Sequence, residues 1–304
     1  MKLLIITQRV DKNDPVLGFF HRWLEVFATR FEKITVICLG KGEYKLPANV
    51  KVLSLGKEEE KSRFGYLWRF HMYIWQERRN YDAVFIHMNQ EYVILGWKFW
   101  WLLGKKIYFW RNHFHGNILT RLAVLLSHKV FYTSSSSYTA RFGKAVKMPV
   151  GIDTNFFKPD PGVARKPNSI LFLGRIGPVK RVLEFVDWLN DLKKQGRGFT
   201  ATIAGSALAK DAQYEREVKK KVSEYSLESQ VEFVGAVNQE GALRLYQSHE
   251  LYVNLTPAGS FDKTIVEAAA CGMKLEVENP EARNLKPEEH SLDKLAEKLA
   301  KEIN

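Results

Sequence analysis

The chain has 304 residues, 45% of them hydrophobic, which is enough for two domains of ordinary size with a core each. Its two cysteines, Cys38 and Cys271, argue against a disulfide framework, and we expect no cleavable signal segment before the first apolar residues. The formal net charge is +12, and residues 1–150 carry +13 while residues 151–304 carry −1. We therefore expect a protein of the reducing cytoplasm whose first half faces an anionic partner.

The first half alternates short apolar runs with amphipathic segments. Strands are predicted at residues 3–7, 34–38, 50–53, 83–87, 106–110 and 129–133, and helices at 19–30, 66–79, 92–103 and 118–126. Four consecutive serines, residues 134–137, follow the last of these strands and are interpreted as a turn and a helix cap. The pattern predicts a doubly wound parallel sheet.

Prolines between residues 148 and 170 mark a boundary, and the same alternation then resumes. Strands are predicted at residues 170–173, 199–204, 230–233 and 251–255, and helices at 182–192, 213–225, 239–247 and 291–303. Residues 276–289 are interpreted as a charged connection. The predicted domains are residues 1–150 and residues 151–304, both Rossmann-like, with the second shortened at its end.

Residues 261–272 (FDKTIVEAAACG) form a polar loop that enters a short helix with one acid, Glu267. The start of a helix offers free N–H groups to an anion, and Glu267 lies about one turn further on, where it can accept hydrogen bonds from sugar hydroxyls. An Ala-rich helix that simply ends at a glycine has the same pattern. The motif alone leaves both interpretations open.

Two cations follow the predicted strand at residues 170–173. The strand breaks at Gly174, Arg175 comes next, and Lys180 stands where an amphipathic helix is expected to begin. Because ligands of open α/β sheets bind at the carboxyl ends of strands, both cations are placed to neutralise a diphosphate. Taken singly, each is more readily an ordinary surface charge, and together with the later acidic helix they favour the ligand site.

Four segments in register resemble the nucleotide-binding half of the retaining glycosyltransferases of family 4. They are PVGIDTNFF at 149–157, FLGR at 172–175 with Lys180, VEFVG at 231–235, and the segment at 261–272. The resemblance implies the GT-B fold, in which two Rossmann-like, doubly wound parallel-sheet domains face each other across a cleft. Family members usually continue after the motif with another strand and helix and then a long helix that returns to the first domain, whereas 32 residues follow Gly272 here.

The resemblance also implies site residues. Arg175 and Lys180 would stabilise the diphosphate in place of a metal, with help from the backbone N–H groups near Lys263 and Thr264, and Glu267 would bind the ribose. The chain has no Asp-x-Asp triplet, and no cofactor is expected. The first acid of the family's E-x7-E signature is replaced by Gly259, with Asp262 nearby but out of register. This departure leaves the donor sugar open.

The first half supplies three further candidates. His113 occupies the place where the family often has a histidine facing the donor sugar, and a structural imidazole is the alternative. Gly18, after the first strand, would let backbone approach a phosphate or an acceptor, or would simply form a turn. Asn89, with His87 and Gln90, closes a strand on the cleft side, where we expect it to contact an acceptor.

Aromatic and basic residues are concentrated in the first half. It contains seven of the eight tryptophans, and residues 101–150 have eight Lys and Arg and no acid. This composition is typical of a surface that docks on an anionic membrane. Lysines interrupt the apolar run at 92–110 before it reaches the roughly 20 residues that a span requires, and a buried helix and strand are the alternative. A nucleic-acid partner is not expected, because no such module is visible.

The sequence therefore predicts a retaining, metal-independent glycosyltransferase. Its donor would be a nucleotide diphosphate sugar, and its acceptor lipid-linked or a glycan at the cytoplasmic face of the cell membrane, as in cell envelope or polysaccharide biosynthesis. The alternative is a weak or inactive homologue that binds a nucleotide sugar or a glycan.

Overall fold

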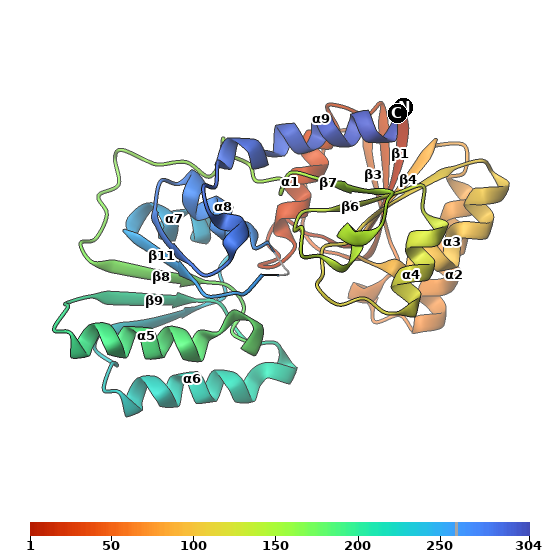
Figure 1. Ribbon diagram of the computed structural model, residues 1–304. Coiled ribbons are helices and arrows are strands. Elements are labelled where there is room, and N and C mark those ends of the chain that lie inside the picture. The colour runs from red at the N-terminus through yellow and green to blue at the C-terminus, as the bar shows by residue number, and fades with distance from the viewer. Residues whose placement is uncertain (259–260) are drawn as a thin grey trace. The chain divides into compact units, whose positions relative to one another are not determined.

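The computed structural model describes residues 1–258 and 261–304, and the chain divides into two compact units (Figure 1). The first unit comprises Met1–Gly151 together with Leu292–Asn304, and the second comprises Ile152–Ser291. The division thus lies one residue after the expected boundary. Residues 292–304, which we expected in the second domain, belong instead to the first unit.

The first unit contains a sheet of seven parallel strands in the order β3-β2-β1-β4-β5-β6-β7. The strands are β1 (Lys2–Val10), β2 (Lys33–Lys41), β3 (Val50–Ser54), β4 (Ala83–His87), β5 (Lys106–Trp110), β6 (Lys129–Tyr132) and β7 (Ala145–Lys147). The helices are α1 (Gly18–Phe27), α2 (Arg63–Gln76), α3 (Gln90–Leu102), α4 (Ile118–Leu126) and α9 (Leu292–Ile303), with 3-10 turns at Lys57–Glu59 and Tyr138–Arg141.

The alternation of side chains along the strands builds a core on each face of this sheet. Leu3 and Ile5 of β1 pack with α1 and α9, whereas Leu4 and Ile6 pack with α2, α3 and α4. Successive strand residues point to opposite faces, so a strand covered by helices on both sides must be apolar throughout. The four residues Leu3–Ile6 are fully buried, as this arrangement requires.

Helix α9 completes one of these cores. Leu292, Leu295, Leu299 and Ile303 recur at helical spacing and are buried with Phe20, Trp23 and Phe27 of α1. Two polar contacts add to the packing: the Tyr108 hydroxyl donates to the Ile303 carbonyl at 3.0 Å, and the Lys129 ammonium lies 2.9 Å from the Glu302 carboxylate. The apolar stripe of α9 is the physical reason why these residues belong to the first unit.

The second unit contains five parallel strands in the order β10-β9-β8-β11-β12. The strands are β8 (Ser169–Leu173), β9 (Thr200–Ala204), β10 (Val231–Gly235), β11 (Leu251–Asn254) and β12 (Lys274–Val277). The helices are α5 (Val182–Lys194), α6 (Ala212–Glu224), α7 (Gln239–Ser248) and α8 (Lys263–Ala270). Short 3-10 turns lie at Pro178–Lys180, Ala209–Asp211, Pro280–Ala282 and Pro287–His290.

Helices cover both faces of the second sheet (Figure 1). Helices α5 and α6 bury their apolar stripes against Ile170, Phe172 and Ile203. On the other side, Tyr246 of α7 packs edge-on against Tyr252 of β11, with ring centroids 5.9 Å apart. Each unit is therefore a three-layer α/β sandwich, as predicted.

Several elements differ from the prediction. Strands β7 and β12 were not predicted. Strand β12 begins two residues after the 261–272 motif, and its last two residues fall in the segment that we interpreted as a charged connection. Lys180 lies in a 3-10 turn, and α5 begins two residues later. In residues 1–258 and 261–304, no helix combines the length and apolar character that crossing a bilayer requires.

Candidate functional site

The strand order of the second unit identifies where a ligand is expected. Strand β8 lies between β9 and β11, so the chain winds one way from β8 to β9 and the other way to β11. In open α/β sheets, ligands bind outside the carboxyl ends of the two strands at such a switch point. Here those ends are Leu173, followed by Gly174 and Arg175, and Asn254.

Two glycines let the chain pass closely at this edge. The backbone N–H of Gly174 donates to the carbonyl of Ala204, the last residue of β9, at 3.0 Å. Gly205 is the next residue after Ala204. Gly205 has φ +142°, and a Cβ atom there would lie 1.8 Å from the Gly174 carbonyl oxygen. Only glycine fits this close approach, which fixes the turn that carries Arg175.

Lys180 and Asp262 are in direct contact at the same edge. The Lys180 ammonium group bonds to Asp262 Oδ2, and the same oxygen accepts a hydrogen bond of 3.1 Å from the Asn254 side chain. Both charged side chains are largely buried. A Cβ at Gly174 would lie 4.0 Å from Lys180 Cε, so the lysine reaches back to the end of β8. The structure thus brings Gly174, Lys180 and Asp262 together.

Tyr252 links three elements beneath this cluster. Its hydroxyl oxygen lies 2.7 Å from Thr264 Oγ1 of α8, 3.3 Å from the Leu173 carbonyl of β8, and 3.1 Å from the Asn254 amide nitrogen. Asp262 precedes α8 without capping it through its side chain. The first turn of α8 is therefore held at the strand ends, with its N–H groups near Thr264 directed to where an anion would bind.

Glu267 lies deeper than the sequence suggests. It is 7% exposed, and its Oε2 accepts a hydrogen bond of 3.0 Å from the Tyr246 hydroxyl. Burial raises the pKa of Glu267, while the Tyr246 hydroxyl and the nearby Lys263 oppose that shift. One carboxylate oxygen is thus committed to the protein.

Lys263 is the cation that offsets this acid. Burial lowers the pKa of Lys263, and the negative charge of Glu267 counteracts that effect. The two residues lie one turn apart on α8. Lys263 therefore compensates the charge of Glu267 from within the same helix, and its role is tied to the state of that carboxylate.

Arg175 differs from its neighbours because its side chain is exposed. Among the residues that the structure describes, its guanidinium makes no hydrogen bond or ion pair. An exposed, uncommitted guanidinium at a strand end is suited to bidentate contact with a phosphate. Gly259, the position of the missing family acid, lies outside the described residues.

Gly18 in the first unit is committed to its own loop. Its N–H donates to the Asp14 carbonyl at 2.9 Å, and a Cβ there would lie 3.1 Å from the Lys12 carbonyl oxygen. The backbone that approaches Gly18 closely is that of residues 11–12. This geometry agrees with the turn interpretation.

Asn89 and His113 follow strands β4 and β5. The Asn89 side-chain oxygen accepts a hydrogen bond of 2.8 Å from Gln8. The exposed His113 accepts the backbone N–H of His115 at its Nδ1, 3.0 Å away, and its Nε2 makes no hydrogen bond among the described residues. His87 is buried among Phe19, Phe20 and Trp23, so it serves the core.

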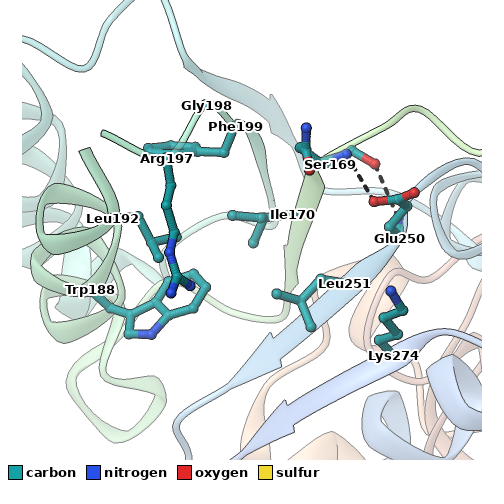
Figure 2. Close-up of a pocket in the computed structure, with 11 residues that line it drawn as sticks. Ser169, Ile170, Trp188, Leu192, Arg197, Gly198, Phe199, Glu250, Leu251 and Lys274 are labelled. Carbon is teal, nitrogen blue, oxygen red and sulfur yellow. Dashed lines mark hydrogen bonds between the residues drawn. The ribbon is translucent and has the colours of Figure 1, made fainter. Parts of the chain in front are cut away.

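A cavity of about 420 Å³ lies at the opposite edge of the second sheet, where its strands begin (Figure 2). Ile170 and Leu251 form its floor, and Trp188 and Leu192 of α5 form a wall. None of the predicted site residues lines it. This cavity is therefore separate from the predicted site residues at the carboxyl edge.

Sequence reasoning missed Tyr246, Tyr252 and Asn254. Tyr252 and Asn254 belong to a buried strand and Tyr246 to a buried helix face, so the sequence pattern indicates core residues at all three positions. A polar residue ending a strand at the switch point, as Asn254 does, is the signal that would have identified this group.

Residues 153–275 match the family model described as glycosyl transferases group 1. No curated protein sequence matches the chain.

Solved structures share the fold across nearly the whole chain. Anabaena HepE in complex with UDP is 19% identical, with a TM-score of 0.72, covering 99% of this chain and 89% of its own. Sucrose-phosphate synthase from Thermosynechococcus elongatus is 13% identical, with a TM-score of 0.69, covering 100% and 95%. WaaG, a glycosyltransferase involved in lipopolysaccharide biosynthesis, is 12% identical, with a TM-score of 0.66, covering 99% of each chain. These likenesses confirm the expected two-domain GT-B fold.

Proposed function

We propose that this chain is a nucleotide-sugar-dependent glycosyltransferase that is retaining and metal-independent. The glycosyl transferases group 1 match in the second unit and the GT-B fold support this proposal. The donor is a nucleotide diphosphate sugar, and the acceptor is membrane-associated or a glycan. HepE structures hold UDP and UDP-glucose, which supports a nucleotide sugar of this kind for the present chain.

The observation that carries the proposal is the gathering of Gly174, Lys180, Asp262 and the start of α8 at the switch point of the second sheet. Sugar transfer from such a donor develops negative charge on the diphosphate as the glycosidic bond breaks. Arg175, Lys180 and the N–H groups of α8 supply positive charge where that leaving group would lie. Protein cations of this kind perform the charge stabilisation that a metal ion performs in other enzymes.

Glu267 is assigned to the ribose. Its Oε2 is bonded to Tyr246, so Oε1 would receive the ribose hydroxyls. His113 is proposed to contact the donor sugar through Nε2, and Asn89 the acceptor. Gly18 would shape the loop after β1 rather than donate to a phosphate, because its N–H is already bonded.

A membrane-facing surface in the first unit supports a lipid-associated acceptor. Exposed aromatic and aliphatic side chains occur on α2, α3 and α4 and on the segment that follows β5: Phe64, Trp68, Trp75, Trp101, Leu102, Phe114, Ile118 and Leu125. Trp101 is 72% exposed and Leu102 74% exposed. Large apolar side chains on helices of a basic unit are typical of docking on anionic lipid. We place the enzyme on the cytoplasmic face of the cell membrane.

An inactive homologue that binds nucleotide sugar is the second candidate. It is favoured by Gly259 in place of an acid and by the contact of Lys180 with Asp262, which offsets the lysine's charge. Calorimetry with a panel of nucleoside diphosphates, followed by an assay of donor hydrolysis, separates the two. Binding with turnover supports the enzyme, binding without turnover supports the binding module, and no binding to any member of the panel contradicts both.

A further inference from the structure

A second cavity lies in the first unit, at the switch point of its own sheet. Strand β1 lies between β2 and β4, and Gln8 of β1 and Asn89 after β4 join their side chains at 2.8 Å. Both residues line a cavity of about 480 Å³. Its walls come from α2 and α3, and Leu39 of β2 completes it. Switch points of open sheets are preferred ligand sites.

The lining changes from polar to apolar along both helices. On α2, Arg63 is the first helical residue, and Leu67 and Phe70 follow on the same face one and two turns later. On α3, Glu91 lies in the first turn and Leu95 one turn further on. The two helices both begin at this cavity, so their positive N-terminal ends lie on its polar side.

Several polar groups on that side are uncommitted. Among the described residues, Arg63 makes no ion pair or hydrogen bond through its guanidinium, and the hydroxyls of Tyr66 and Tyr92 have no partner. Burial raises the pKa of Tyr92 to about 12, so its hydroxyl stays protonated and can donate. Asn89 does not cap α3 with its side chain, because its oxygen is bonded to Gln8. A ligand with a phosphate would satisfy these donors.

The apolar side of the cavity continues onto the exposed surface of α2. Leu67 is partly exposed, and Phe64 and Trp68 beside it on α2 are more so. Leu95 on the α3 wall is 41% exposed. An apolar chain could therefore leave the cavity along an apolar surface, without crossing a polar rim. A free saccharide would not need such an apolar exit.

We propose that this cavity binds the phosphate and the adjoining apolar chain of a lipid-linked acceptor. The phosphate lies by Arg63 at the start of α2, and the chain runs along Leu67, Phe70 and Leu95. Glu91 and the Gln8–Asn89 pair face the saccharide hydroxyls. This inference rests on the proposed glycosyltransferase function and narrows its acceptor to a lipid phosphate.

The test uses the full chain and farnesyl phosphate as the probe, measured by calorimetry below its micelle concentration. Leu95→Trp fills the cavity and Arg63→Ala removes the cation, and each is expected to weaken binding by about tenfold or more. Leu125→Trp on α4 and Arg79→Ala beyond the end of α2 are matched controls outside the cavity, and they should bind as the wild type does. Thermal unfolding of each variant checks that the first unit folds.

Three further ligands identify what the cavity recognises. Farnesol and inorganic phosphate should each bind more weakly than farnesyl phosphate. Equal binding of farnesol overturns the phosphate contact, and equal binding of phosphate overturns the lipid contact. If a soluble trisaccharide binds the wild type, and Leu95→Trp abolishes its binding but not that of farnesyl phosphate, the cavity is a glycan site instead.

Titration with UDP and other nucleoside diphosphates separates this inference from the proposed function. The cavity variants should leave nucleotide binding unchanged, since every residue they alter lies in the first unit. If no nucleotide binds but farnesyl phosphate still does, the donor proposal is overturned and the proposal for the cavity stands. Unimpaired binding of farnesyl phosphate to both Leu95→Trp and Arg63→Ala would overturn the cavity alone.

Discussion

The Lys180 ammonium group is bonded to the Asp262 carboxylate at the carboxyl edge of the second sheet. The aspartate also accepts a hydrogen bond from Asn254, so its position is fixed from β11. A diphosphate that approaches Lys180 must therefore compete with the Asp262 carboxylate for the lysine, because both groups are anions. Arg175 has no such partner among the described residues, so its predicted contact with the ligand would face no such competition.

Replacing either cation should weaken binding of the diphosphate selectively. Lys180→Ala and Arg175→Ala each remove a charge-assisted hydrogen bond, which is worth about 1.5–3 kcal/mol, so affinity for a nucleoside diphosphate should fall about tenfold or more. Affinity for the nucleoside should change little. Calorimetry measures both, with Lys194→Ala on α5 as the control. Equal losses for nucleoside and diphosphate would refute the assigned contact.

Asp262→Asn should instead strengthen the binding of a nucleoside diphosphate that carries no sugar. The variant keeps the side chain's size and removes the negative charge beside Lys180, so affinity should rise by a few-fold, in line with about 1 kcal/mol for one partly buried charge. Competition titration against the wild type measures the change. A decrease would mean that Asp262 positions Lys180 for the ligand rather than competing with it.

Binding of the nucleoside part should depend on pH through Glu267. Burial raises the pKa of this carboxyl above its ordinary value, and ribose hydroxyls bind its ionised form. Affinity should therefore fall as the pH is lowered from about 8 to about 5. This fall should occur at a higher pH than it would if the carboxyl belonged to an exposed glutamate. Glu267→Gln should bind weakly without this dependence. A wild-type affinity that is flat over the range would exclude Glu267 from ribose binding.

Gly205→Ala should destabilise the second unit. The new Cβ would lie 1.8 Å from the Gly174 carbonyl oxygen, at a backbone φ of +142° that other residues rarely adopt. The cost of clash and strain is more than about 2 kcal/mol, which urea unfolding followed by circular dichroism would detect. Gly198→Ala is the control, because a Cβ there meets no atom within 4 Å. Similar midpoints for the two variants would contradict the close packing of the two strand exits.

Docking on lipid should require the exposed apolar residues of the first unit. Leu102→Asp should reduce cosedimentation with anionic vesicles by about tenfold, since burial of a leucine contributes about 1.5–3 kcal/mol. Leu208→Asp, at an exposed leucine of the second unit, is the control. Binding should also weaken at high salt, where the Debye length falls to about 3 Å at 1 M. Vesicle binding that Leu102→Asp leaves unchanged would exclude this surface.

Much of the fold follows from the periodicity of the sequence. Strands β4 and β5 and helix α4 were predicted to the residue, because the two strands are short, mainly apolar runs and the helix is an amphipathic segment between Asn117 and Ser127. The edge strands β7 and β12, only three and four residues long, escaped prediction since partly exposed edge strands lack that apolar character.

The site was predictable only in part. Gly174, Lys180, Asp262 and Glu267 belong to segments with recognisable chemistry, so the sequence indicated them. The commitment of Lys180 to Asp262, and of Glu267 to Tyr246, depends on contacts between residues 82 and 21 positions apart. Such pairings arise from the strand order, which local patterns do not determine.

Helix α9 makes the first unit discontinuous in the chain. Its apolar stripe fills a core shared with α1, yet the ribosome produces it after every residue of the second unit. During synthesis the first sheet therefore emerges with one face covered by α1 but not yet by α9, while the second unit already has all the strands and helices that the structure describes in it. Translation order thus favours completion of the later unit before the earlier one.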